Sequence, residues 1–170
     1  MTASFLARLQ PLSRRVVASP LTQLLARVFL GGLFVWSGLE KCWHFEAFMA
    51  AVHAYGVLPA DWAIFYAHAL PWAEILAGAY LIVGLFTRWA AGLIAAMMLS
   101  FIIAIAWVLA RGGAIDCGCF VGGRQEPLTP QKLLEDIALL AMSLWLIVSP
   151  SGPWSLDRLL RRKNQTPPAV

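Results

Sequence analysis

Charged residues are scarce in this sequence. Only 13% of the 170 residues are Asp, Glu, Lys or Arg, 60% are hydrophobic, and the mean hydropathy is +0.71. Soluble domains carry about a quarter charged residues, and a fold this small buries too little surface to hide so many apolar side chains from water. The net charge of +4 does not indicate a nucleic-acid-binding surface, because the basic residues gather at the chain ends. The composition therefore predicts a protein embedded in a lipid bilayer.

Familiar catalytic and cofactor-binding motifs are also missing. The sequence has no phosphate-binding Walker loop, no dinucleotide-binding glycine pattern, no HExxH zinc motif and no Ser/His/Asp arrangement. No residue pattern marks a haem. The residues alone therefore assign no cofactor or resident metal, and they argue against a soluble enzyme and against nucleic acid as a partner.

Four apolar segments are each near the length that a helix needs to cross a bilayer, about 20 residues. They are residues 21–42, 62–86, 89–110 and 133–148. Helices are favoured because hydrocarbon offers no partners to exposed backbone groups. The sequence predicts an all-α fold, an integral membrane four-helix bundle over residues 21–149. A basic interfacial segment, 1–20, precedes it, and a basic interfacial and disordered tail, 150–170, follows.

Basic residues are distributed unevenly between the two sides of this predicted bundle. Nine of the 13 lie toward the side that holds both chain ends and the turn after the second span, and four, among them Lys41, lie toward the other side. The positive-inside rule then places both termini in the cytoplasm. We expect a multi-pass protein of the bacterial cytoplasmic (inner) membrane, with loops 43–61 and 111–132 outside. Arg27 and Arg88 are interpreted as interfacial anchors at inner helix ends.

All three cysteines fall at the predicted outer face. Cys42 ends the first span, and Cys117 and Cys119 begin the second outer loop. That side of the membrane is oxidising, so disulfides persist there. Two cysteines separated only by Gly118 can close only a small, strained ring, and strained disulfides are more easily reduced. This spacing favours a redox-active dithiol.

Two other interpretations of the cysteine pair stay open at this level. The two thiolates could form half of a Cu(I) or Zn site that Cys42, His44 or His53 completes. They could also be inert loop thiols. The role of Cys42 is equally open, between packing at a helix end and relaying electrons to the pair.

An acidic residue, Glu74, lies near the middle of the second predicted span. Such a residue is costly in lipid, so it should face the bundle interior and either have a partner or be protonated. Its helix face also carries Pro71 and Gly78, and small residues there allow another helix to approach closely. Lys41, near the outer end of the first span, is its candidate partner. The pair is interpreted either as a proton-handling site or as a structural ion pair that fixes helix packing.

Several segments together resemble a known family. They are Ser37–Lys41 (SGLEK), Tyr55–Pro59 (YGVLP), Pro71–Gly78 (PWAEILAG) and Arg111–Phe120 (RGGAIDCGCF). In this order they resemble the MauE/DoxX family of small four-helix membrane proteins, across roughly residues 21–148. The CGCF stretch is the most specific part and is similar to the MauE branch, methylamine utilisation proteins, although Val121 stands where that branch has glycine.

The resemblance implies thiol redox chemistry outside the cytoplasm, beside a thioredoxin-like partner. MauE proteins are associated with maturation of methylamine dehydrogenase, a disulfide-rich periplasmic enzyme, and DoxX relatives with passing electrons to quinone. Carried over to this chain, the loop thiols are Cys117 and Cys119, and the membrane charges are Lys41 and Glu74. A quinone becomes a candidate acceptor by analogy only.

We therefore expect a membrane thiol–disulfide oxidoreductase, or its accessory, which exchanges disulfides through Cys117 and Cys119. Lys41, Cys42 and Glu74 are candidates for relay or proton handling. The alternatives are a non-catalytic assembly subunit of a larger membrane complex, and a protein that handles a metal or a small solute.

Overall fold

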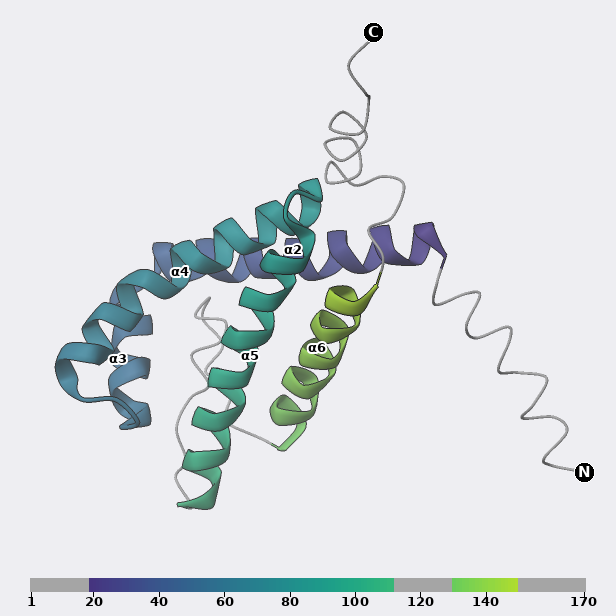
Figure 1. Cartoon of the computed structure of the whole chain (residues 1–170). Helices are drawn as coiled ribbons and strands as arrows, with labels where there is room; N and C mark the ends of the chain where they lie inside the picture. Colours follow the sequence, from purple (N-terminus) through teal and green to yellow (C-terminus); the bar gives the residue numbers. More distant parts are fainter. Residues whose placement is uncertain (1–18, 112–129, 150–170) are drawn as a thin grey trace, which may run out of the picture.

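The computed structural model describes residues 19–111 and 130–149 (Figure 1). Within these ranges the chain forms five helices and no strand, so the predicted all-α class is confirmed. In chain order the helices are α2 (Pro20–Trp43), α3 (Phe45–Tyr55), α4 (Ala60–Val83), α5 (Thr87–Ala110) and α6 (Pro130–Val148). The predicted terminal segments and the Cys-Gly-Cys sequence lie outside the described residues.

The four predicted spans correspond to α2, α4, α5 and α6, with ends that differ by at most three residues. Helix α3 is a correction, because the sequence interpretation left residues 43–61 as a loop. It is too short to cross a bilayer, but its apolar residues recur at helical spacing, and Phe48 is buried in the core beside Met49 and Val52. Gly56 ends the helix in the left-handed conformation, at φ 60°.

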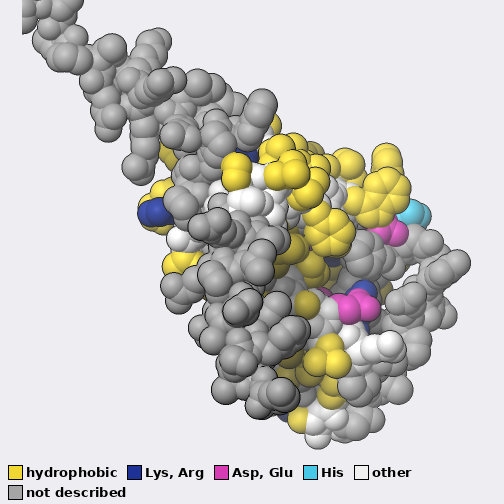
Figure 2. Space-filling model, turned by 90° about the vertical axis from the view of Figure 1, so that its right-hand side faces the viewer, with side chains coloured by type: hydrophobic (Ala, Val, Ile, Leu, Met, Phe, Trp, Pro, Cys, Tyr) yellow, Lys and Arg dark blue, Asp and Glu magenta, His cyan; other side chains and the backbone are white. Residues whose placement is uncertain are grey.

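Two helices, α2 and α5, are long and apolar enough to cross a membrane by length and composition. The most apolar 18-residue window of α5 has a mean hydropathy of 2.6, and only 33% of that window is buried. The rest of that window is exposed or only partly buried. On the face shown in Figure 2, hydrophobic side chains make up most of the described side-chain surface, and charged side chains occur as small separate patches. Such a surface suits contact with lipid better than contact with water.

The helices pack as two pairs. Helices α2 and α4 run side by side, and so do α5 and α6, which lie across the direction of the first pair in Figure 1. Helix α3 packs against α4, and a short turn joins α4 to α5. The core between them is mostly aliphatic and aromatic, with fully buried side chains such as Leu30, Phe34, Leu81, Ile94 and Ile105.

Small residues allow α2 and α4 to approach closely. A Cβ added to Gly31 would lie 2.7 Å from the carbonyl oxygen of Gly78, and one added to Gly38 would lie 2.7 Å from that of Pro71. Each helix contributes its two contacts seven residues apart, in opposite order along the chain, so the helices are antiparallel and one face of each meets the other. The small-residue face predicted around Glu74 is therefore a helix–helix contact.

Arg27 is not the interfacial anchor that the sequence suggested. Its side chain is only 3% exposed, and its Nε donates to the carbonyl of Leu81 over 3.0 Å. A Cβ on Gly84 would lie 1.8 Å from a guanidinium nitrogen, so the left-handed glycine at the end of α4 makes room for the arginine. A cation near the carbonyl end of a helix is favourable, and burial there outweighs access to the interface. Arg88 is exposed, as an anchor requires.

Candidate functional site: a buried ion pair beside an apolar cavity

Lys41 and Glu74 form a buried ion pair between α2 and α4. The Lys41 Nζ lies 3.0 Å from Glu74 Oε1 and 2.9 Å from Oε2, and the side chains are 2% and 1% exposed. The ammonium also donates to the hydroxyl of Ser37, one turn earlier on α2. The close approach at Gly38 and Pro71 carries both residues inward, so the sequence's candidate partner for Glu74 is the observed one.

Aromatic rings surround the lysine. Its Nζ lies 5.6 Å from the ring centroid of Phe48 and 5.9 Å from that of Phe101, within the range of cation–π attraction. Phe48 comes from α3 and Phe101 from α5, so four helices meet at the ion pair. Neither ring was predicted as part of a site, because Phe48 lies in an unexpected helix and Phe101 in an unbroken apolar run.

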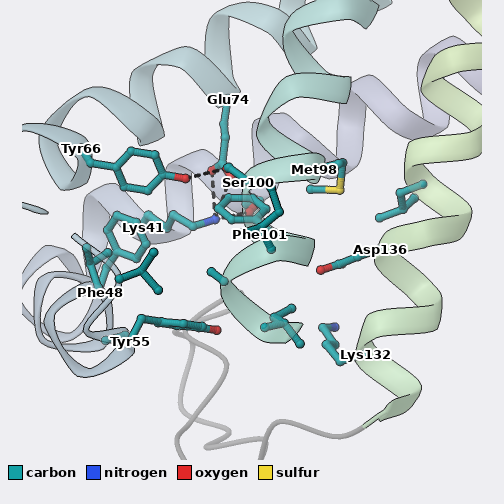
Figure 3. A pocket seen from close by; sticks show the side chains of 18 of the residues that line it. Lys41, Phe48, Tyr55, Tyr66, Glu74, Met98, Ser100, Phe101, Lys132 and Asp136 are labelled. Atoms are coloured by element: carbon teal, nitrogen blue, oxygen red, sulfur yellow. Dashed lines mark hydrogen bonds and ion pairs between the residues drawn. The ribbon is translucent and has the colours of Figure 1, made fainter. Parts of the chain in front are cut away.

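A second polar contact joins α4 to α5. Ser100 donates its hydroxyl proton to the carbonyl of Met97 over 2.7 Å, so the Tyr66 hydroxyl is the donor in its 3.0 Å contact with Ser100 Oγ. Figure 3 shows both side chains next to the ion pair. The donors whose contacts are described on this side, those of Lys41, Tyr66 and Ser100, are thus directed at acceptors of the protein itself.

These groups line a cavity of about 360 Å³, within the size range of small-molecule sites, roughly 300–1,000 Å³. All five helices contribute to its wall, which is mostly apolar. Five ionisable side chains with formal charge line it: Lys41, Glu74, Lys132, Glu135 and Asp136. A largely apolar cavity with a few converging polar groups is the usual form of a binding site.

Asp136 on α6 faces the cavity from the side away from the ion pair (Figure 3). It is 6% exposed, and its Oδ2 has no hydrogen-bond partner among the described residues. The next pair along the helix, Lys132 and Glu135, is a 3.0 Å contact in which Glu135 is 61% exposed. Asp136 was not singled out from the sequence, although the signal was the one that identified Glu74, an acid inside a predicted apolar span.

Tyr55, at the end of α3, points toward the cavity near Asp136 (Figure 3). Burial raises the pKa of the Tyr55 phenol above its usual range, and the Asp136 carboxylate raises this pKa further. The phenol therefore stays neutral at physiological pH. It adds a polar but uncharged atom to the part of the wall that faces Asp136.

Comparison with known proteins identifies the chain's relatives. The family model for methylamine utilisation protein MauE matches residues 19–149. This chain belongs to the MauE family. No solved structure matches it significantly.

Curated MauE proteins match over most of their length. The methylamine utilization protein MauE of Paracoccus denitrificans is 35% identical over 126 residues, which cover 74% of this chain and 68% of the relative. That of Methylorubrum extorquens is 35% identical over 147 residues, covering 83% and 79%. Membership of the MauE family and the two apolar helices together indicate a membrane protein.

The remaining predicted site residues are the three cysteines and two histidines. Cys42 lies beside Lys41 near the end of α2 as a free, half-buried thiol, whereas Cys117 and Cys119 lie outside the described residues. His44 and His53 are exposed. Between residues 19 and 111 and between 130 and 149, no group of three or more His, Cys, Asp or Glu side chains could hold a metal ion.

The quinone that the resemblance suggests does not fit the described cavity well. Quinone carbonyls accept hydrogen bonds and need donors. Three donors of the described wall, those of Lys41, Tyr66 and Ser100, are directed at protein acceptors, and Asp136 Oδ2, which has no hydrogen-bond partner among the described residues, is itself an acceptor. The Asp136 side of the cavity in this MauE-family chain therefore complements a donor, and we derive no step through a quinone.

Proposed function

We propose that this MauE-family protein is a multi-pass protein of the bacterial inner membrane that takes part in methylamine utilisation through thiol–disulfide exchange. It acts as an oxidoreductase, or as the accessory of one, with a periplasmic thioredoxin-like partner. The observation that carries the proposal is the family match over residues 19–149, because that range includes Cys117-Gly118-Cys119 and the relatives are named methylamine utilisation proteins.

The proposed chemistry is a dithiol–disulfide exchange. The thiolate of Cys117 or Cys119 attacks a disulfide of the partner, which forms a mixed disulfide and releases one partner thiolate. The second cysteine then attacks the mixed disulfide, closes the Cys117–Cys119 bond and releases the second partner thiolate. The chain loses two electrons and two protons, and the partner gains them. The same steps in reverse reduce the chain and oxidise the partner.

The proposed topology has α2, α4, α5 and α6 as spans and both termini in the cytoplasm. The charge distribution supports it, and the placement of the cavity shows which helix ends lie together. Lys41 near the end of α2, Ile105 near the end of α5 and Asp136 near the start of α6 all line the cavity. The chain between α5 and α6, which carries both cysteines, therefore starts and finishes at the end of the fold where the cavity lies.

Cysteine trapping tests the thiol chemistry. The full chain carrying Cys119→Ser, and separately Cys117→Ser, is expressed in a methylamine-grown bacterium, quenched in acid and run on non-reducing gels. One of the two should accumulate a mixed disulfide with a thioredoxin-like protein, because the resolving thiol is missing. Cys42→Ser is the matched control and should trap nothing. If neither loop variant traps a partner, and the double variant supports normal growth on methylamine, the redox proposal is wrong.

A reporter fusion tests the topology separately. Alkaline phosphatase fused after Phe120 should be active, since it folds only outside the cytoplasm, whereas a fusion to the C-terminus should be inactive. The opposite pattern would place the cysteines in the reducing cytosol and remove the basis for disulfide exchange with a periplasmic partner.

A further inference from the structure

The cavity wall contains a buried carboxylate, Asp136, whose Oδ2 has no hydrogen-bond partner among the described residues. Lys41 is matched by Glu74, and Lys132 is in contact with Glu135. Asp136 remains, so the formal charges of the described lining residues sum to one negative. Burying a carboxylate is costly unless it is paired and hydrogen-bonded. An occupant that brings a positive charge and an N–H donor would remove that cost.

The rest of the cavity lining indicates the size and polarity of the occupant. Most of the lining is apolar, with aliphatic side chains such as Leu33, Ile105 and Leu139. Phe48, Phe101 and Tyr55 add aromatic rings, whose faces attract cations. The volume of about 360 Å³ is roughly twelve times the ~30 Å³ share of one water molecule. The occupant is therefore a molecule with a substantial apolar body, larger than a one-carbon amine.

We propose that this cavity binds a lipophilic organic ammonium ion, an apolar molecule with a single protonated amine. Its N–H group donates to Asp136 Oδ2, the neutral hydroxyl of Tyr55 lies beside the amine, and the apolar body fills the space toward Phe101. The Lys41–Glu74 pair closes the far side and keeps its own hydrogen bonds. The inference does not depend on the thiol chemistry proposed above, because every residue that it uses lies in the described helices.

A pair of nearly isosteric probes tests the charge requirement. The full chain is purified in a non-ionic detergent, and 4-phenylbutylamine and 4-phenylbutanol are titrated by calorimetry at pH 7, with detergent alone as the blank. The amine should bind at least tenfold more tightly than the alcohol, since only the amine neutralises Asp136. Equal affinities would show an apolar cavity that also takes a lipid chain, and would overturn the proposal.

Substitutions test the site. Asp136→Asn should weaken amine binding at least tenfold and leave alcohol binding unchanged, whereas Glu46→Gln, at an exposed acid of α3 outside the cavity lining, should change neither. Ala104→Phe, which fills the cavity from α5, should abolish binding of both probes. Retained amine affinity in Asp136→Asn or in Ala104→Phe would refute the site. Melting curves without probe confirm that each variant is folded. If Asp136→Asn fails to fold, the comparison of the two probes and the Ala104→Phe variant still test the ammonium site.

One more variant distinguishes the ammonium site from the thiol chemistry proposed above. A chain with both loop cysteines, Cys117 and Cys119, changed to Ser should bind 4-phenylbutylamine with unchanged affinity. Loss of amine binding in that variant would contradict the independence stated here. Absence of amine binding in the native chain would refute the ammonium site and leave the trapping experiment as the test of disulfide exchange.

Discussion

Removing one member of the buried ion pair should destabilise the protein far more than removing both. Lys41 and Glu74 are 2% and 1% exposed, and the ammonium contacts both carboxylate oxygens at 3.0 and 2.9 Å. Truncating one partner of such a pair costs about 3–5 kcal/mol, because the other charge is left buried and unpaired. Lys41→Met and Glu74→Leu should therefore each lower the free energy of unfolding by about that amount.

The double variant Lys41→Met/Glu74→Leu should recover most of the loss. Replacing a buried pair by apolar residues of similar volume is often neutral or stabilising. The three variants are compared by denaturant unfolding in micelles, followed by tryptophan fluorescence. Glu135→Gln is the control, since its exposed contact with Lys132 should contribute less than about 1 kcal/mol. Single variants that each cost less than about 1 kcal/mol, or a double variant no more stable than the singles, would refute this reasoning.

The same double variant separates the two interpretations of the pair. If Lys41 and Glu74 serve only to fasten α2 to α4, the folded double variant should support growth on methylamine. If they handle protons, it should be folded and inactive. The unfolding measurement and the growth measurement together therefore assign the role.

Three further substitutions probe the packing. Gly78→Val should destabilise the fold by about 1–3 kcal/mol or prevent folding, because a Cβ there meets an α2 backbone oxygen at 2.5 Å; Gly32→Val, with nothing within 4 Å of its added Cβ, should be neutral in the same unfolding assay. Arg27→Met should lower the melting temperature by several degrees because a carbonyl of α4 loses its donor, whereas exposed Arg88→Met should not; equal effects would contradict the burial of Arg27. Tyr66→Phe should cost about 0.5–1.5 kcal/mol in unfolding free energy, and no measurable change would mean that its hydroxyl contact contributes nothing.

Local features of the sequence were enough to predict the four long helices. Continuous apolar runs predicted four of the five described helices to within three residues, because helix length and hydropathy are properties of adjacent residues. Helix α3 was not predicted because its 11 residues are too few to span a bilayer. The role of Gly56 as the residue that ends this helix can be recognised only when the helix itself is known.

The candidate site was predicted in part. Glu74 was identifiable because a carboxylate in an apolar helix requires a partner, and Lys41 was the nearest candidate. The aromatic rings and Asp136 were not identified, since nothing local distinguishes Phe48 or Phe101 from other apolar residues. Arg27 was interpreted as an anchor for a related reason, because its position near a helix end says nothing about which helix packs over it.

The sequence by itself determined that the chain is unusually apolar, where its long helices lie, and which charged residues fall inside apolar segments. Each of these follows from how neighbouring side chains partition between water and hydrocarbon. The tertiary structure alone decided which of those charges meet, and it left Asp136 Oδ2 without a hydrogen-bond partner among the described residues. Antiparallel contact at two glycine positions brings Lys41 to Glu74, and the placement of α6 leaves Asp136 Oδ2 facing a cavity. Such outcomes depend on distances between residues that are remote in sequence, which only the packing of helices against one another sets.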